Sequence, residues 1–121
     1  MTVVVVSGGR HYPDAERVFE TLDRVNQEYG PISLLVEGGA TGADYYAARW
    51  AIARDVPHQS VPANWVKEGR AAGPKRNQAI LDGTRPKVAV FFPGGAGTAD
   101  MRRRCEIAKK EYGLIIIEVV A

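Results

Sequence analysis

The chain has 121 residues, of which 45% are hydrophobic and 25% are charged, which is the length and composition of one folded domain. This balance excludes a disordered or fibrous chain. The longest aliphatic runs, Val3–Val6 and Leu114–Ile117, are far shorter than the ~20 residues that span a bilayer. We therefore expect a single domain over residues 1–121, with no membrane segment and no signal peptide. The single cysteine, Cys105, cannot form an internal disulfide, so the default expectation is a cytoplasmic protein.

The net charge of +2 is unevenly distributed along the chain. Residues 1–60 carry 5 Lys and Arg against 8 Asp and Glu, a net charge of −3, whereas residues 61–121 carry 11 against 6, a net charge of +5. The second half is therefore the better place for an anionic partner, although a solvated basic face explains the same excess.

Five runs rich in β-branched residues predict five strands, at Thr2–Ser7, Ile32–Glu37, His58–Pro62, Lys87–Phe92 and Leu114–Val120. Four of these runs are almost continuously hydrophobic, which is typical of strands covered on both faces in a parallel sheet. The third run is short and mixed, which suits the edge of a sheet.

Between these runs, apolar residues recur at helical spacing and predict helices at Asp14–Tyr29, Thr41–Arg54, Pro74–Leu81 and Thr98–Tyr112. Thr41 and Thr98 are residue types that cap helix N-termini. Strands that alternate with helices predict an α/β fold, in which a parallel sheet carries helices on both faces.

Glycine-rich loops follow the first, second and fourth predicted strands, at Ser7–Tyr12, Glu37–Asp44 and Pro93–Thr98. In open α/β sheets, ligands bind beyond the carboxyl ends of the strands, so these loops lie where a ligand site is expected. Successive backbone N–H groups that lead into a helix N-terminus bind anions. One such loop alone is explained by a tight turn, but three at one edge favour a phosphate site. No Walker A or G-x-G-x-x-G pattern is present.

The segment Ala63–Asn77 follows the third predicted strand and combines an aromatic residue with several cations. Trp65 is suited to stacking on a base, and Lys67, Arg70, Lys75 and Arg76 are suited to pairing with phosphates. The alternative is that Trp65 fills the core beneath the loop and that the basic side chains are solvated.

Other chemically distinctive residues favour structural roles. His11 and His58 have no partners at metal-ligand spacing, so we expect no metal and no bound cofactor. Cys105 falls on the apolar stripe of a predicted helix, which indicates a core position. Trp50 favours packing or a subunit contact over ligand binding. The run Arg102–Arg104 covers three directions of one helical turn and is typical of a solvated face, with an interface or a phosphate contact as the alternative.

Four motifs together resemble the SLOG superfamily of Rossmann-like nucleotide-binding proteins, and within it the YspA-like group of small bacterial and phage proteins. The motifs are Gly8-Gly9-Arg10 with Tyr12, Glu37-Gly38-Gly39-Ala40 with Gly42-Ala43-Asp44, Ala72-Gly73-Pro74 with Arg76-Asn77, and Pro93-Gly94-Gly95-Ala96-Gly97-Thr98. The resemblance covers nearly the whole chain. It implies a three-layer Rossmann-like fold with strand order 3-2-1-4-5 and a nucleotide-type ligand between the ends of the first and fourth strands.

The resemblance also implies where this chain departs from enzymes of the superfamily. The branch similar to LOG phosphoribohydrolases cleaves the N-glycosidic bond of nucleoside monophosphates with a carboxylate at the end of the pattern P-G-G-x-G-T-x-x-E. Here that position is Met101, which can neither exchange a proton nor carry charge. Arg76 does match the catalytic arginine of that branch. The other candidates for catalytic residues are Asp44, Glu37 and Asp100.

The loops and the resemblance together predict a ligand site with the members Gly8, Gly9, Arg10, Gly38, Gly39, Asp44, Trp65, Arg76, Asn77, Pro93, Gly94, Gly95, Gly97 and Thr98. The Pro93–Thr98 loop is expected to hold a phosphate at the helix N-terminus. Arg76 is expected to pair with a phosphate oxygen, and Asp44 or Glu37 to accept from a ribose hydroxyl.

The predicted function is binding of a nucleotide or nucleotide-derived molecule, of the ADP-ribose, NAD or nucleoside-phosphate class, by a homo-oligomer that senses, sequesters or processes it. The first alternative is an N-glycosidic hydrolase of nucleoside monophosphates. The second is binding of single-stranded nucleic acid, as in the branch similar to DprA. That alternative has little support, because the net charge is only +2 and no row of aromatic residues accompanies the basic ones.

Overall fold

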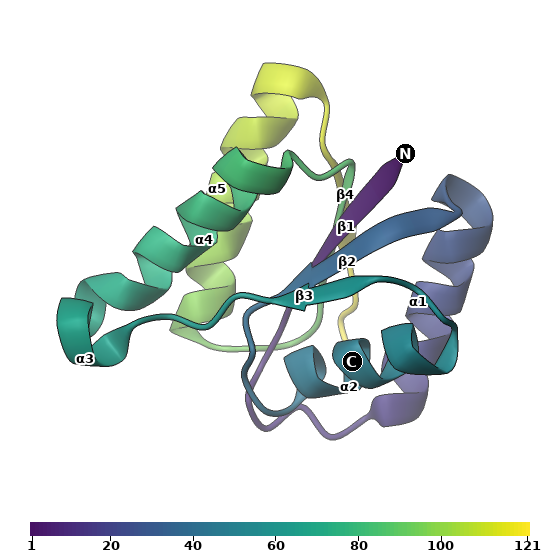
Figure 1. The fold of residues 1–121 in the computed structure, drawn as a ribbon, viewed down its shortest axis with the longest axis horizontal. Coiled ribbons are helices and arrows are strands. Elements are labelled where there is room, and N and C mark those ends of the chain that lie inside the picture. Colours follow the sequence, from purple (N-terminus) through teal and green to yellow (C-terminus); the bar gives the residue numbers. More distant parts are fainter.

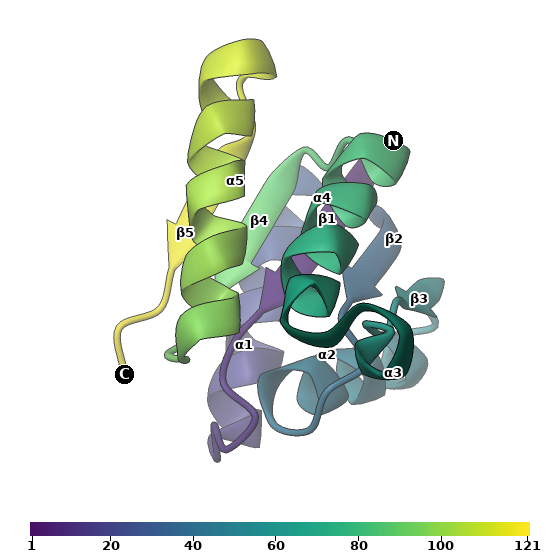
Figure 2. The ribbon, with the colours of Figure 1, turned by 90° about the vertical axis from the view of Figure 1, so that its left-hand side faces the viewer.

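A five-stranded parallel sheet forms the centre of the computed structural model, which describes residues 1–121, and its strand order is β3-β2-β1-β4-β5 (Figure 2). The strands are β1 (Thr2–Ser7), β2 (Ile32–Glu37), β3 (His58–Ser60), β4 (Val88–Phe91) and β5 (Ile115–Glu118). Every neighbouring pair is parallel, and Val5 of the central strand lies opposite Val36 on one side and Ala89 on the other. The predicted fold class and strand order are confirmed.

Helices cover both faces of this sheet and complete a three-layer fold (Figure 1). One face carries α1 (Ala15–Tyr29) and α2 (Ala43–Ala53), and the other carries α4 (Ala72–Thr84) and α5 (Ala96–Tyr112). A short helix, α3 (Trp65–Glu68), and a 3₁₀ turn, η1 (Gly69–Ala71), lead into α4. None of the helices is both long and apolar enough to cross a membrane.

The two faces of the sheet form two hydrophobic cores, because side chains alternate along each strand. Val4 and Val6 belong to the core beneath α1 and α2, hereafter the first core. Val5 belongs to the core beneath α4 and α5, hereafter the second core, which also contains Met101 and Cys105. Burial of both faces explains why the strands are continuously hydrophobic rather than alternating.

Trp50 and Cys105 are both fully buried, as the sequence predicts for packing residues. The indole Nε1–H of Trp50 donates to Asp23 Oδ1 at 2.8 Å, so the one polar atom of the ring has a partner inside the chain. Burial raises the pKa of the Cys105 thiol to about 12, which keeps it protonated and unreactive at neutral pH.

The predicted starts of two helices are wrong. The N-caps of α2 and α5 are Gly42 and Gly95, neither of which has a capping side chain. Thr41 instead donates its hydroxyl to the Arg10 carbonyl in another loop, at 2.9 Å. Thr98 lies inside α5, which begins two residues earlier than predicted. At Thr41, a contact between loops therefore overrides the local capping preference.

Candidate functional site

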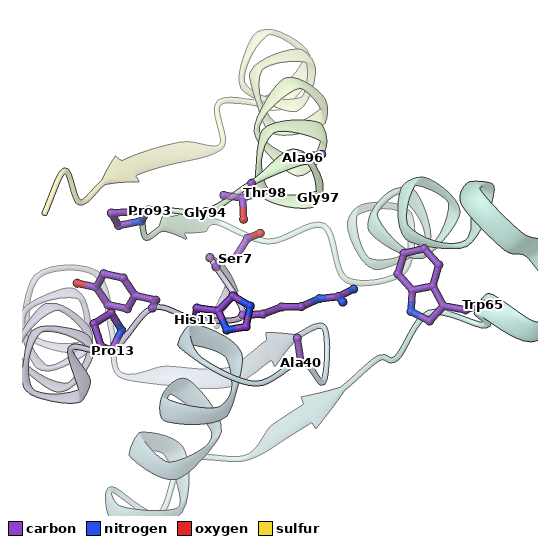
Figure 3. Close-up of a pocket in the computed structure, with 15 residues that line it drawn as sticks. Ser7, His11, Pro13, Ala40, Trp65, Pro93, Gly94, Ala96, Gly97 and Thr98 are labelled. Atoms are coloured by element: carbon purple, nitrogen blue, oxygen red, sulfur yellow. The ribbon is translucent and has the colours of Figure 1, made fainter.

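A pocket of about 710 Å³ opens at the carboxyl ends of β1 and β4, between the loop after β1 and the N-terminus of α5 (Figure 3). Its volume lies within the range of small-molecule sites. No acidic residue lines it, and the lining residues are Ser7, Gly8, Gly9, Arg10, His11, Tyr12, Pro13, Ala40, Trp65, Pro93, Gly94, Gly95, Ala96, Gly97 and Thr98.

The three glycine-rich loops meet backbone to backbone at this edge of the sheet. The Gly9 N–H donates to the Pro93 carbonyl at 2.9 Å, and the Ala43 N–H donates to the Gly9 carbonyl at 3.2 Å. A Cβ atom on Gly8 would lie 2.6 Å from the Cβ atom of Ala43, closer than real contacts allow. The loop after β1 therefore joins the other two, and this joint requires glycine.

Gly42 and Gly94 are also explained by close packing between loops. Gly42 has a φ of +71°, and a Cβ atom there would lie 2.7 Å from the carbonyl carbon of Arg10. A Cβ atom on Gly94 would collide with the hydroxyl of Thr98 and would lie 2.7 Å from Gly9 N. These glycines hold the framework of the pocket, whether or not a ligand is bound.

Gly95 and Gly97 differ, because the fold does not require glycine at either position. A Cβ atom on either residue would have no neighbour within 4 Å, and neither has a positive φ. Both lie where α5 begins and face the pocket.

The first turn of α5 contains backbone N–H groups that have no hydrogen-bond partner within the helix. The Ala99 N–H is the first to donate within the helix, to the Gly95 carbonyl at 3.0 Å. The N–H groups of Ala96, Gly97 and Thr98 precede it, and no side chain caps the helix. These three donors, together with the positive end of the helix dipole, form an anion-binding geometry at the pocket wall.

Trp65 lies at one end of the pocket (Figure 3), and the Arg10 side chain approaches its ring. Trp65 is 49% exposed, so it does not fill the core and that part of the alternative is wrong. Lys67, Arg70 and Lys75 are exposed to solvent, as the same alternative expects. The Arg10 Cζ atom lies 5.8 Å from the centroid of the indole. A Cβ atom on Gly73 would lie 3.1 Å from the indole ring, so α4 supports the ring from beneath. The exposed indole offers a stacking surface.

Arg76 does not reach the pocket, and its guanidinium is used inside the chain. Arg76 Nη1 donates to the carbonyls of Gly38 and Val61 at 2.8 and 3.1 Å, and Nε donates to Asn77 Oδ1 at 2.9 Å. A Cβ atom on Gly38 would lie 2.5 Å from Nη1, so this glycine gives the guanidinium room. Arg76 thereby ties the loop after β2 to α4.

Two buried carboxylates lie in the same region as Arg76. Glu37 is 1% exposed; it accepts from the Gly39 N–H at 2.9 Å and from the Ser60 hydroxyl at 3.0 Å. Asp44 Oδ2 accepts from the N–H groups of Gly38 and Ala40 at 3.1 and 3.3 Å. Burial raises the pKa of both carboxyls, that of Asp44 to about 6. We call Glu37, Asp44, Ser60, Arg76 and Asn77 the Arg76 cluster.

Asn77 and Asp100 connect the Arg76 cluster to the first turns of α5, outside the pocket. Asn77 Nδ2 donates to Asp100 Oδ2 at 3.0 Å and to the Gly97 carbonyl at 3.3 Å. Arg104 Nε donates to the same carboxylate at 2.8 Å. Burial alone would raise the pKa of Asp100, but the bonds from Arg104 and Asn77 outweigh it and lower the pKa.

The structure therefore divides the predicted ligand-binding residues between two places. The pocket is lined by Gly8, Gly9, Arg10, Trp65, Pro93, Gly94, Gly95, Gly97 and Thr98. Gly38, Gly39, Asp44, Arg76 and Asn77 belong to the Arg76 cluster or lie beside it, and the remaining catalytic candidates, Glu37 and Asp100, are also outside the pocket. Six further residues line the pocket without having been predicted from the sequence: Ser7, His11, Tyr12, Pro13, Ala40 and Ala96. Tyr12, Ala40 and Ala96 lie within the glycine motifs, and Ser7, His11 and Pro13 lie next to the first of them.

Met101, at the position where the resembling hydrolases carry a catalytic glutamate, is 2% exposed and packs in the second core. Its side chain lies beneath α5 rather than in the pocket. Methionine in place of glutamate therefore removes the charge. In addition, α5 directs the side chain at residue 101 into the apolar second core.

The fold and the pocket define a Rossmann-like α/β protein with a glycine-lined site at the carboxyl edge of a parallel sheet. Residues 2–67 match the profile of the YAcAr family, described as the YspA, cpYpsA-related SLOG family. The chain is also 30% identical over 124 residues to the Gene 61 protein of Mycobacterium phage D29, across 97% of this chain and 95% of the relative. The chain belongs to the YspA, cpYpsA-related SLOG family, as the sequence motifs predict.

Proposed function

We propose that the chain binds a nucleotide or nucleotide-derived small molecule in the pocket between the loop after β1 and α5. The observation that carries the proposal is the first turn of α5, where uncapped N–H groups and the two open glycines, Gly95 and Gly97, face a 710 Å³ pocket. A phosphate at this position accepts from the N–H groups of Ala96, Gly97 and Thr98. Side chains at the two glycines would occupy the space that the phosphate needs.

The base of the ligand stacks on Trp65 in this proposal. The indole is half-exposed and supported by α4, so it offers a stacking surface that does not have to be assembled on binding. The Arg10 guanidinium lies beside the ring and adds a positive charge to a pocket without acidic residues. An anionic aromatic ligand matches both features.

The proposal favours binding over N-glycosidic hydrolysis. Glycosidic cleavage in the resembling enzymes relies on a carboxylate at the reacting centre, and no carboxylate lines this pocket. Glu37, Asp44 and Asp100 are each engaged by hydrogen bonds within the chain. We propose that the Arg76 cluster supports the loop after β2 rather than contacting the ligand.

We further propose that this single domain works in the cytoplasm as a homo-oligomer. The isolated chain exposes large apolar side chains on separate helices, among them Ile52 on α2 (65% exposed) and Ile107 on α5 (59% exposed). Light scattering coupled to size-exclusion chromatography measures the oligomeric state directly.

The experiment that tests ligand binding is thermal melting with AMP, ADP, ATP, NAD and ADP-ribose, followed by calorimetric titration. A ligand at a hundredfold excess over its Kd stabilises the fold by ~2.7 kcal/mol. Gly95→Val is expected to abolish binding without lowering stability, because residue 95 lines the pocket and a Cβ atom there meets no other atom of the chain within 4 Å. Gly83→Val is the matched control, since Gly83 is exposed in α4 and also has open space around it.

Three results would contradict the proposal. The first is that no nucleotide raises the melting temperature. The second is that Gly95→Val binds as tightly as the wild type. The third is that small nucleotides do not bind, whereas oligonucleotides bind with a steep salt dependence. That result would support binding of single-stranded nucleic acid instead.

A further inference from the structure

A second hollow, of about 430 Å³, lies beside the pocket, on the other side of the segment Arg10–Pro13. It is lined by Arg10, His11, Tyr12, Pro13, Thr41, Gly42, Tyr45 and Tyr46. The four residues of the segment also line the pocket, so one stretch of chain forms a rim between the two spaces. A ligand longer than a mononucleotide can extend from one space into the other across this rim.

The rim is fixed in place by contacts on both sides. The Thr41 hydroxyl donates to the Arg10 carbonyl at 2.9 Å, which ties the rim to the loop that precedes α2. The Tyr12 ring packs against Phe92 with centroids 5.3 Å apart, which ties it to the first core. His11 is exposed between these two anchors. The second hollow is therefore a formed feature of the fold rather than a gap beside a free loop.

The wall opposite the rim is aromatic. Tyr45 and Tyr46, in the first turn of α2, pack edge to face with their centroids 5.7 Å apart. Tyr46 also packs against the first core, whereas Tyr45 is 51% exposed. The Arg49 Cζ atom lies 6.0 Å from the Tyr45 centroid and supports this ring. No acidic residue lines the hollow.

We propose that the second hollow is a subsite for a second base, and that the ligand is a dinucleotide whose two nucleosides are joined through phosphates. This inference rests on the proposed function, which places the first base on Trp65 and a phosphate at α5. Tyr45 then supplies the stacking surface for the second base. The phosphate linkage crosses the rim beside His11, whose imidazole is within reach of both spaces.

Calorimetric titrations with three probes test the subsite. The probes are AMP, with one base; ADP-ribose, with one base and a second sugar; and diadenosine diphosphate, with two bases. For the wild type, diadenosine diphosphate is expected to bind about 5-fold to 150-fold more tightly than AMP, the range for stacking one further base. ADP-ribose lacks the second base and is expected to bind without that gain.

Variants at the two stacking residues separate the two spaces. Tyr45→Ala is expected to remove the advantage of diadenosine diphosphate and to leave the affinity for AMP unchanged. Tyr45→Phe retains the ring and is expected to restore the advantage. Trp65→Ala is expected to weaken AMP and diadenosine diphosphate by the same factor. Tyr45 is half-exposed, so melting curves of its variants are expected to match the wild type.

The outcomes distinguish this inference from the proposed function. If AMP and diadenosine diphosphate bind the wild type equally, or if Tyr45→Ala retains the difference, the second subsite is wrong and the proposed function stands. If none of the three probes binds while ADP, ATP or NAD does, the second subsite is wrong and the proposed function stands. If no nucleotide binds, the proposed function fails and the subsite fails with it.

Discussion

The loops after β2 and β4 have nearly the same composition, yet one is closed and the other open. In the loop after β2, the N–H groups of Gly38, Gly39 and Ala40 all donate to carboxylates of the chain itself. In the loop after β4, the N–H groups that begin α5 have no side-chain partner, and Gly95 and Gly97 face open space. Both loops present backbone N–H groups in a geometry that suits an anion, but only the loop after β2 has carboxylates of the chain itself on those groups.

This difference comes from acidic residues at two positions. Glu37 ends β2 and Asp44 lies in the first turn of α2, so their carboxylates reach back to the intervening N–H groups. The loop after β4 has no acidic residue before Asp100, whose carboxylate is held by Asn77 and Arg104. Acidic residues that flank a glycine-rich loop can thus accept hydrogen bonds from its backbone N–H groups. Without such residues, the N–H groups stay available to an external anion.

The largest expected loss of stability comes from placing a carboxylate beneath the open loop. Met101→Glu would bury a charge in the second core, where no donor corresponds to those around Glu37. We expect the free energy of unfolding to fall by about 3–5 kcal/mol, measured by urea denaturation, with no release of base from AMP. Met101→Leu, the volume-matched control, is expected to cost less than about 1.5 kcal/mol. A Met101→Glu protein of wild-type stability that hydrolyses AMP would show that this side chain reaches the pocket.

Removing the cation of the closed loop is expected to have the next largest effect. Arg76→Met loses the hydrogen bonds to the Gly38 and Val61 carbonyls and leaves the carboxylates of the cluster without their nearby positive charge. We expect a loss of about 2–4 kcal/mol in the same assay. Arg70→Met, on the exposed η1, is the control and is expected to change stability by less than about 0.5 kcal/mol. If Arg76→Met instead keeps its stability and loses nucleotide binding, Arg76 contacts the ligand directly.

The pH dependence of stability is expected to report Asp44. Its pKa is about 6 in the folded protein against an ordinary 3.8, so the folded state holds the proton more tightly than the unfolded chain. The stabilising contribution is present in full below about pH 4 and is lost as the pH rises through 6. From pH 4 to pH 7.5, the wild type is expected to lose about 1–3 kcal/mol relative to Asp44→Asn. Parallel pH profiles for the two proteins would contradict this.

The smallest change in stability is expected where the open loop is given its own anion. Gly97→Asp places a carboxylate in the first turn of α5, which favours the helix by about 0.3–1 kcal/mol. The same charge competes with a phosphate, so nucleotide affinity is expected to fall more than tenfold. Gly97→Asn has the same shape without the charge, and a smaller loss of affinity in this control would assign the effect to electrostatics. Equal affinities in all three proteins would mean that no anion binds there.

The architecture could be predicted from the sequence because it depends on patterns within single elements. The hydrophobic runs around Val4 and Val90 are long enough to require cover on both faces, and the intervening helical stripes supply that cover. The start of α2 after the N-cap Gly42 could not be predicted, because Thr41 bonds to a loop that is distant in sequence.

Only part of the candidate site could be predicted from the sequence. The loop motifs and the resemblance led to the glycines and to Trp65, which line the pocket, but they grouped Arg76 and Asp44 with these residues, and both lie outside the pocket. Whether an arginine binds a ligand or a neighbouring carbonyl depends on how α4 packs against the loop after β2, and no local pattern records that. Nothing in the sequence pattern singled out Tyr45 as a stacking residue. Its exposure depends on the direction in which the first turn of α2 faces in the folded chain.

The contrasting environments of the two tryptophans have a spectroscopic consequence. Trp50 is fully buried with its N–H bonded to Asp23, whereas Trp65 is half-exposed at the pocket. The fluorescence of the chain is therefore a sum of two emitters, one shielded at shorter wavelength and one solvated at longer wavelength. If the proposed base stacks on Trp65, it would quench only the second emitter, and Trp50 would serve as an internal intensity reference. The ratio of the two emissions would then follow binding in a titration without an added dye.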